Sequence, residues 1–307
     1  MNAHKTLYEL ESRGDFIRRH IGPTEQQVTH MLATLGLDSL EQIVERAVPD
    51  SIVSRSPLTL TETVSERAIL HHLGAMRERN HVNISMIGMG YYGTLMPEVI
   101  KRNVLENPGW YTAYTPYQAE ISQGRLEALL NYQQMVIDLT GMELANASML
   151  DEATAAAEAM AMAHRLSKNR SPRFLVDTDC HPQTIAVLQT RARYFDFEIV
   201  LGDAHTLLLE GEYFGALLQY PASSGALRDH SAFISTAHER GMLVSLASDL
   251  LSLVLLKPPG EMNADIVVGS AQRFGVPMGY GGPHAAFFRY PRALCAFHAG
   301  PYHRGVA

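Results

Sequence analysis

From residue 173 to residue 288, short β-rich runs alternate with helical or turn segments, and this alternation constrains the fold more than any other feature. The β-rich runs lie at residues 173–176, 198–201, 216–220, 242–247, 265–268 and 285–288. Strands separated by helical crossovers pair in parallel, and a parallel sheet carries helices on both faces. We therefore expect an α/β fold with a mostly parallel sheet and helices on both faces.

The first 85 residues follow a different pattern and predict a helical amino-terminal arm. Residues 24–27 form a capping box in front of apolar residues at helical spacing, and Gly36 ends this helix. A short helix is expected after Ser39, and another over residues 65–79 after an extended connection. The expected organisation is an arm at 1–85, an α/β domain at 86–288 and a tail at 289–307.

Two long amphipathic helices are expected between the arm and the strands, at residues 123–139 and 151–168. The second helix opens with Asp151 and Glu152. Free N–H groups at a helix start can bind a phosphate, but adjacent carboxylates would repel one, so we favour capping over phosphate binding. The glycine-rich run at 279–284 predicts only a tight loop.

Composition argues against several classes of function. The formal net charge is −7 and no basic run could neutralise phosphates, so nucleic acid is not an expected partner. No apolar stretch approaches the roughly 20 residues of a spanning helix, so a membrane is not expected either. Residues 1–19 mix charged with apolar side chains, unlike a signal or transit peptide, and the expected location is the cytoplasm.

Cysteine and histidine give no disulfide or metal signature. Cys180 and Cys295 are the only cysteines, too few for a disulfide framework, and both are expected to be free thiols. The 14 histidines do not follow the spacing of known zinc sites. No metal site is expected.

Several strings resemble the amino-terminal half of the P-protein of the glycine cleavage system. They are RRHIGP (18–23), IGMGY (87–91), LENPGWYTAYTPYQ (105–118), SQGRLE (122–127), LDEATAAAEA (150–159) and GSAQRFGVP (269–277). The resemblance runs from about Leu7 to Phe288 without a large gap. It implies a PLP-dependent transferase-like large domain, of the aspartate aminotransferase type, for the α/β domain.

The resemblance also implies an activity. Members of this family decarboxylate glycine with pyridoxal phosphate (PLP) and pass the aminomethyl group to the lipoyl arm of the H-protein. PLP is the electron sink, and the protein supplies a Schiff-base lysine and an acidic partner for the pyridinium nitrogen. Two similar halves form the functional unit, the carboxyl-terminal half holds PLP, and this chain matches the other half. The expected partners are the H-protein and the catalytic half, and a dimer-forming surface is expected.

The chain has only four lysines, at positions 5, 101, 168 and 257. None precedes the glycine-rich loop, where the catalytic half carries its lysine. Alignment of the proline and glycine residues places Gln272 there, and an amide cannot form an imine. The same comparison places Ala247 opposite the pyridinium nitrogen, although a short shift would place Asp249 there. We expect no catalytic residue and no covalently bound PLP in this chain, and no activity of the chain alone.

We expect the chain to contribute a wall of the substrate site or lipoyl channel. Residues 86–123 are rich in glycine, tyrosine, threonine and proline around one helix that begins at Pro97. Clustered aromatic hydroxyls favour a wall of the substrate site or lipoyl channel of a partner half, and a roof over the core is the equally weighted alternative. The candidate wall residues are Tyr91, Tyr92, Thr94, Tyr114, Thr115, Tyr117 and Gln118. The alternative functions are a non-catalytic subunit supporting a separate catalytic half, and an independent PLP enzyme using another lysine.

The tail departs from the family after Phe288. The family continues with a segment ending Arg-Ser-Met-Pro-Gly-Arg-Ile-Ile-Gly-Val-Ser, and codons for residues 296–307 can spell this string in a neighbouring frame. We expect a frameshift near residues 288–290 that truncates the protein, which the coding DNA would test, and a genuine divergent tail is the alternative. An exposed sheet edge beside the strand at 285–288 is expected to follow.

Overall fold

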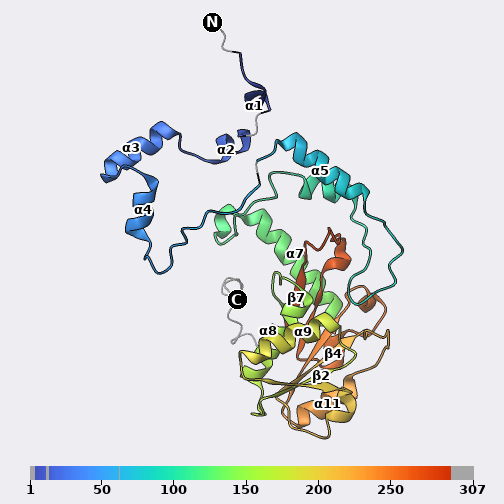
Figure 1. Ribbon diagram of the computed structural model, residues 1–307. Coiled ribbons are helices and arrows are strands. Elements are labelled where there is room, and N and C mark those ends of the chain that lie inside the picture. The colour runs from blue at the N-terminus through green and yellow to red at the C-terminus, as the bar shows by residue number, and fades with distance from the viewer. Residues whose placement is uncertain (1–3, 12–13, 62, 292–307) are drawn as a thin grey trace. The chain divides into compact units, whose positions relative to one another are not determined.

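The computed structural model describes residues 4–11, 14–61 and 63–291 (Figure 1). The chain divides into two compact units, Met1–Ile84 and Ser85–Ala307, which we describe separately. From the sequence, we expected the boundary between the arm and the α/β domain to lie between residues 85 and 86. No helix in the described part of the chain has the length and apolar content needed to cross a membrane.

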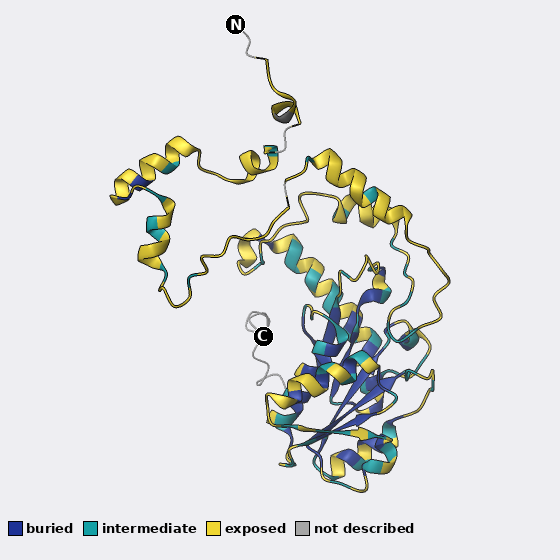
Figure 2. Cartoon of the chain, in the orientation of Figure 1, coloured by how far each residue is buried: buried dark blue, intermediate teal, exposed yellow. Residues whose placement is uncertain are grey.

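The first unit is built from short helices joined by extended segments. Thr24 accepts a hydrogen bond from the N–H of Gln27 in a capping box, and Gly36 adopts a left-handed conformation after the helix, as the sequence predicts. Of the described residues of this unit, only Leu32 and Leu37 are buried (Figure 2). The unit therefore has almost no apolar core of its own. Its helices are α1 (Leu7–Leu10), α2 (Asp15–His20), α3 (Glu25–Leu35), α4 (Leu40–Ala47) and α5 (Glu66–Glu78).

The second unit contains a seven-stranded sheet in the order β1-β7-β6-β5-β4-β2-β3. Strands β3, β2, β4, β5 and β6 pair in parallel, whereas β7 pairs antiparallel with β6 and with β1. The expected mostly parallel sheet is confirmed, and every β-rich run forms a strand. The strands are β1 (Leu144–Ala145), β2 (Arg173–Asp177), β3 (Glu198–Gly202), β4 (Gly215–Tyr220), β5 (Leu243–Ser248), β6 (Ile266–Ser270) and β7 (Ala286–Tyr290).

Helices cover both faces of this sheet, because its buried strands present apolar side chains to both sides. One core cluster joins the sheet to α7 and α11, and the other joins it to α8 and α9 (Figure 1). The expected helices at 123–139 and 151–168 are confirmed as α7 and α8. The helices are α6 (Glu98–Ile100), α7 (Gln123–Thr140), α8 (Glu152–Leu166), α9 (Pro182–Arg193), α10 (Ala204–Leu207) and α11 (Ser231–Glu239), with a π-helix, η1 (Lys101–Leu105), and 3-10 turns η2 (Ala119–Ile121), η3 (Ser252–Val254), η4 (Pro259–Met262) and η5 (Gln272–Phe274).

Helix α8 packs closely on the sheet because its inner face consists mainly of alanine. It contacts β4, β5, β6 and β7. Small side chains let a helix backbone approach its neighbours closely. Large residues on the facing strands then fill the space between helix and sheet. The first turn of α8 is thereby held at the end of the sheet where the parallel strands finish. The buried alanines are Ala153, Ala155, Ala156, Ala157, Ala159 and Ala163.

Strand β7 corrects two expectations about the end of the domain. It continues through Arg289 and Tyr290, two residues beyond the expected boundary at Phe288. It is also not an exposed edge, because β1 pairs with its outer side and all its residues are buried. Arg289 is fully buried, and its Nε and Nη2 atoms have no hydrogen-bond partner in the structure. Residues 292–307, which include Cys295 and most of the expected frameshifted tail, lie outside the described residues.

The close contact between β5 and β6 at Gly269 yields a test of this packing. A Cβ atom at Gly269 would overlap the carbonyl oxygen of Ser248 and lie 2.6 Å from the ring of Phe287. We expect Gly269→Ala to lower the free energy of unfolding by about 1–3 kcal/mol, measured by urea denaturation. Gly124→Ala is the matched control, because a Cβ there meets no atom within 4 Å in the exposed first turn of α7. It should be neutral or stabilising by up to about 1 kcal/mol. Equal losses in the two variants would contradict this packing.

Candidate functional site

The parallel strands β2, β4, β5 and β6 end at the same edge of the sheet, and polar residues gather there. His181 follows β2, Gln219 lies near the end of β4, and Asp249 follows β5. The first turn of α8 brings Glu152 to the same edge. We call this region the strand-end cleft, and it contains two small cavities. Ligands bind at such edges in open α/β sheets, because loops and helix amino termini converge beyond the strands.

Glu152 and His181 line both cavities, together with Gly90 and Ser270. The first has a volume of about 30 Å³ and is also lined by residues 89–91, by the start of α8 and by His284. The second has a volume of about 20 Å³ and is also lined by Gln219, Asp249, Gln272 and Arg273 among others. Each has room for little more than one or two water molecules.

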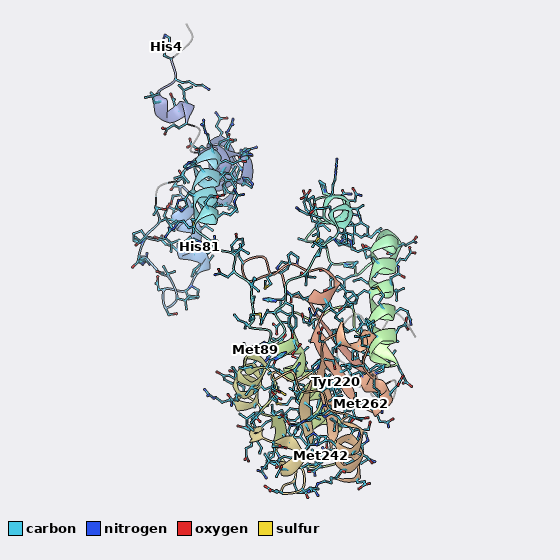
Figure 3. All side chains as sticks on the ribbon, turned by 90° about the vertical axis from the view of Figure 1, so that its right-hand side faces the viewer. His4, His81, Met89, Tyr220, Met242 and Met262 are labelled. Carbon is cyan, nitrogen blue, oxygen red and sulfur yellow. The ribbon has the colours of Figure 1, made fainter. Side chains whose placement is uncertain are left out.

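A loop at residues 88–94 covers the strand-end cleft (Met89 is labelled in Figure 3). Gln183 donates a hydrogen bond from Nε2 to the carbonyl of Met89 at 2.8 Å, and Thr94 donates one from Oγ1 to the carbonyl of Val276 at 2.8 Å. At Gly90, φ is +83° and a Cβ would lie 3.4 Å from the ring of His181. The glycine therefore lets the backbone turn directly above the cleft.

Arg273 and Asp249 form a two-point ion pair inside the cleft. The Nε and Nη2 atoms of Arg273 lie 2.9 and 2.8 Å from the two carboxylate oxygens of Asp249. The side chains are 19% and 21% exposed. The guanidinium also stacks on the ring of Tyr92, 3.6 Å from its centroid. This cluster ties the 88–94 loop to the ends of β5 and β6.

Glu152 is a buried carboxyl group of the cleft, and its pKa is strongly raised. Burial raises its pKa to about 7, although Gln219 and the backbone N–H of Ser270 donate hydrogen bonds to it. The nearby charges of Asp249 and Asp151 raise the pKa further. A carboxyl group with this pKa exchanges a proton near neutral pH.

Asp151 has a structural role at the start of α8. Its Oδ1 accepts a hydrogen bond from the N–H of Thr154 at 2.8 Å, so it caps the helix. This confirms the capping interpretation of residues 151–154.

His181 is buried in the cleft and forms a hydrogen bond with the side chain of Ser223. Its Nδ1 lies 2.8 Å from Oγ of Ser223, in the turn after β4. Burial lowers the pKa of His181 and favours the neutral ring. Neighbouring Cys180 is a free, buried thiol whose pKa burial raises well above its ordinary value.

The similarity to known proteins extends over most of the chain. The family model described as "Glycine cleavage system P-protein" matches residues 18–295. The chain belongs to the glycine cleavage system P-protein family. The glycine dehydrogenase (decarboxylating) of Dechloromonas aromatica is 60% identical over 290 residues, and that of Stutzerimonas stutzeri is 58% identical over 283. These alignments cover 94% and 92% of this chain but 30% and 29% of the relatives, so the chain spans under a third of their length.

A solved structure supports the same fold. The chain is similar to a crystal structure of glycine decarboxylase (P-protein) of the glycine cleavage system in inhibitor-bound form. The sequence identity is 35%, the TM-score is 0.76, and the alignment covers 89% of this chain and 62% of the other. The PLP-transferase-like fold expected from the P-protein strings is therefore confirmed.

The structure divides the candidate wall residues of this P-protein family member into two groups. Tyr91 lines the first cavity with its ring 6.0 Å from that of His284, Tyr92 lines the second cavity, and Thr94 anchors the loop above them. The other four lie on the 114–118 segment and line neither cavity; these are Tyr114, Thr115, Tyr117 and Gln118. Tyr114 and Tyr117 are exposed and Thr115 is partly buried.

Several cleft residues were not among the sequence-based candidates. Gln219 and His181 lie in no motif, and Arg273 lies in the family-like string 269–277 without having been chosen as a candidate. Each lies at or just after a β-rich run, where parallel strands bring side chains together. Their positions next to strand ends were the available signal. Among the described residues, no group of three or more histidine, cysteine, aspartate or glutamate side chains could hold a metal ion.

The Arg273–Asp249 pair yields a test of how firmly the cleft is closed. We expect Arg273→Met and Asp249→Asn each to lower the free energy of unfolding, because each leaves a partly buried charge unpaired. A double-mutant cycle should give a coupling energy of about 1–3 kcal/mol.

The ion pair between Arg191 and Glu158 is the control, because its side chains are 46% and 48% exposed and join α9 to α8 at 3.4 Å. Its coupling should stay below about 1 kcal/mol. A coupling at Arg273–Asp249 no larger than the control would mean that this pair does not hold the cleft together.

Proposed function

We propose that this chain is the amino-terminal part of a P-protein whose complete form uses PLP to decarboxylate glycine and transfers the aminomethyl group to the lipoyl group of the H-protein. The observation that carries this proposal is the 60% identity to a glycine dehydrogenase (decarboxylating) over 94% of the chain. The PLP-bearing half and the H-protein are the partners that it implies. PLP would supply the electron sink for the carbanion left by decarboxylation.

The residues of the strand-end cleft do not fit PLP. None of the four lysines, all of which lie within the described residues, lines either cavity. Lys257 donates a hydrogen bond to Ser231 at 3.0 Å, and Lys101 lies 3.8 Å from Glu98. Gln272 stands in the cleft instead, with its side chain almost fully buried. This arrangement supports a cofactor site elsewhere in the complete protein.

Two further contacts support the same conclusion. The carboxyl groups of Asp151 and Glu152 occupy the start of α8, where a phosphate group would need free N–H groups and no negative charge. Asp249, the candidate partner for a pyridinium nitrogen, already has both oxygens bonded to Arg273. The proposed role of the chain is therefore to shape the reaction site, and not to supply a group that holds the cofactor.

The proposed contribution has an inner and an outer part. The inner part is the 88–94 loop, which is fixed to the cleft at Met89, Tyr92 and Thr94. The outer part is the 114–118 segment, whose tyrosines are exposed and could face the substrate site or the lipoyl arm in the complete protein. A fixed loop beside an exposed aromatic segment suits a surface that orients a substrate and excludes water.

A non-catalytic subunit that supports a separate PLP-bearing half is the second candidate function. The closed strand-end cleft favours it, because a half without a cofactor site can still supply a wall in trans. The two candidates differ in whether the amino-terminal part belongs to the same chain as the PLP-bearing half or supports that half as a separate chain.

An exchange assay tests both candidates. The chain is mixed with a separately produced PLP-bearing half, and exchange of the glycine carboxyl group with labelled bicarbonate is measured. We expect no exchange from this chain alone and exchange from the mixture. Tyr92→Phe and Tyr117→Phe should each lower the exchange rate or the affinity for the H-protein by about tenfold, the effect of one lost hydrogen bond to a reacting complex.

The control variant is Tyr194→Phe, at the exposed end of α9, which should leave the rate unchanged. Exchange by the PLP-bearing half that does not depend on this chain would exclude the supporting subunit. Unchanged rates and affinities in Tyr92→Phe and Tyr117→Phe, measured in the mixture or in a complete P-protein, would exclude the proposed wall.

A further inference from the structure

Two large residues hold a left-handed backbone conformation, and both lie in loops at the strand-end cleft. Among the described residues, those other than glycine with a positive φ are Asp196, Asn263, Met89 and Tyr280. Aspartate and asparagine adopt this conformation at little cost, whereas Met89 (φ +54°) and Tyr280 (φ +60°) adopt it against a steric penalty. Large residues kept in this conformation cluster at active sites and ligand-binding loops. Met89 belongs to the 88–94 loop described above, and Tyr280 does not.

The second of these residues lies in the loop at residues 275–284, whose ends reach both cavities of the strand-end cleft. Arg273, just before the loop, lines the second cavity, and His284, its last residue, lines the first. Thr94 of the 88–94 loop donates a hydrogen bond to a carbonyl of the 275–284 loop at 2.8 Å. The two loops that carry the strained residues are thus joined to each other beside the cleft.

The turn that carries Tyr280 is fixed by its own backbone. The N–H groups of Gly281 and Gly282 both donate to the carbonyl of Met278 at 3.0 Å. At Gly279 a Cβ would lie 2.0 Å from the carbonyl oxygen of Gly282, so no larger residue fits there. The side chain of Tyr280 is 85% exposed, so its burial contributes little to the stability of this chain. The tight turn therefore presents an aromatic ring to the solvent at a cost in backbone strain.

The surface around this ring is apolar and uncharged. Residues 275–283 contain no charged side chain. Met278 is exposed two residues away, and Leu95, whose carbonyl oxygen would lie 3.2 Å from a Cβ at Gly275, is exposed as well. A zwitterion such as glycine is bound by charged partners, whereas aliphatic and sulfur-containing groups pack on aromatic rings. Of the two substrates of the proposed reaction, this surface therefore suits the lipoyl group, which is an aliphatic chain that ends in a sulfur-containing ring.

We propose that Tyr280 binds and orients the lipoyl group, whose aliphatic chain and sulfur atoms pack on the tyrosine ring during aminomethyl transfer. This inference rests on the proposed function and extends it, because the sequence predicted only a tight loop at residues 279–284. The strained conformation of Tyr280 fixes where the ring stands before the lipoyl group arrives, which lowers the cost of ordering it on binding. The ring makes contact with the lipoyl group and transfers no proton.

Transfer kinetics test this contact in the mixture of the chain with the PLP-bearing half, or in a complete P-protein that carries the same 275–284 loop. Free lipoamide is the acceptor, so that docking of the H-protein does not contribute. We expect Tyr280→Gly to raise the KM for lipoamide by about tenfold and to leave the KM for glycine unchanged, since the ring contacts only the lipoyl group.

Tyr194→Gly is the matched control, because Tyr194 is 81% exposed and has an ordinary φ of −88°. It should leave both KM values unchanged. An unchanged KM for lipoamide in Tyr280→Gly would overturn the proposal, and so would an equal rise in the KM for glycine. An unchanged KM for lipoamide with weaker association with the PLP-bearing half would instead assign the ring to a protein interface, which also overturns it.

Thermal unfolding of the chain alone separates a contact with lipoamide from a structural role. Tyr280→Gly removes the steric penalty but gives the unfolded chain more freedom, so the unfolding temperature should stay the same or rise. The same change at Tyr194 relieves no strain and should lower the unfolding temperature. A larger decrease in Tyr280→Gly than in Tyr194→Gly would show that Tyr280 serves the fold of the chain, and the proposal would fail.

Direct binding covers the case in which the unmodified mixture is inactive, a result that counts against the proposed function alone. Saturation-transfer nuclear magnetic resonance detects contact between lipoamide and the chain by itself. We expect transfer to the protons of the sulfur-containing ring in the unmodified chain, a weaker signal in Tyr280→Gly and an unchanged signal in Tyr194→Gly. Equal signals in the three proteins, or no signal in any of them, would overturn the contact at Tyr280.

Discussion

The close packing of the alanine face of α8 on the sheet is the constraint on which the rest of the structure depends. Because the helix lies against β4, β5, β6 and β7, its first turn stays at the edge where the parallel strands end. Glu152 is therefore brought to residues that are far away in the sequence, among them Gln219 and Ser270. A larger side chain on the inner face of α8 would move this turn and the strand-end cleft with it.

Within this frame, the cleft is occupied by the chain's own side chains. The ion pair of Arg273 with Asp249 engages both carboxylate oxygens of Asp249, and Gln272 lines the same cavity with its side chain buried. The 88–94 loop closes the remaining space through Tyr92 and the backbone of Gly90. The family fold is retained, and our proposal that the chain acts as a supporting half rests on this filled cleft.

Sequence periodicity was sufficient for the sheet and for the main helices, because strand and helix patterns are local. The pairing direction of β7 and the two-residue strand β1 were not predicted, since both depend on which strand meets β7 at its far side. The Arg273–Asp249 pair was not predicted either, because it joins the ends of two strands that only the sheet order makes neighbours. For the candidate wall, the sequence placed Tyr91 and Tyr92 in one group with Tyr114 and Tyr117, since aromatic loops look alike until their contacts are known.

The central claim is that this chain shapes the reaction site of a P-protein without holding its cofactor. The most direct measurement is incubation of the folded chain with PLP, followed by borohydride reduction and peptide mass spectrometry of the lysines. The account predicts no saturable visible absorbance and no stoichiometric pyridoxyl group on any of the four lysines. A single lysine labelled in proportion to the protein, together with a saturable absorbance that borohydride abolishes, would contradict it.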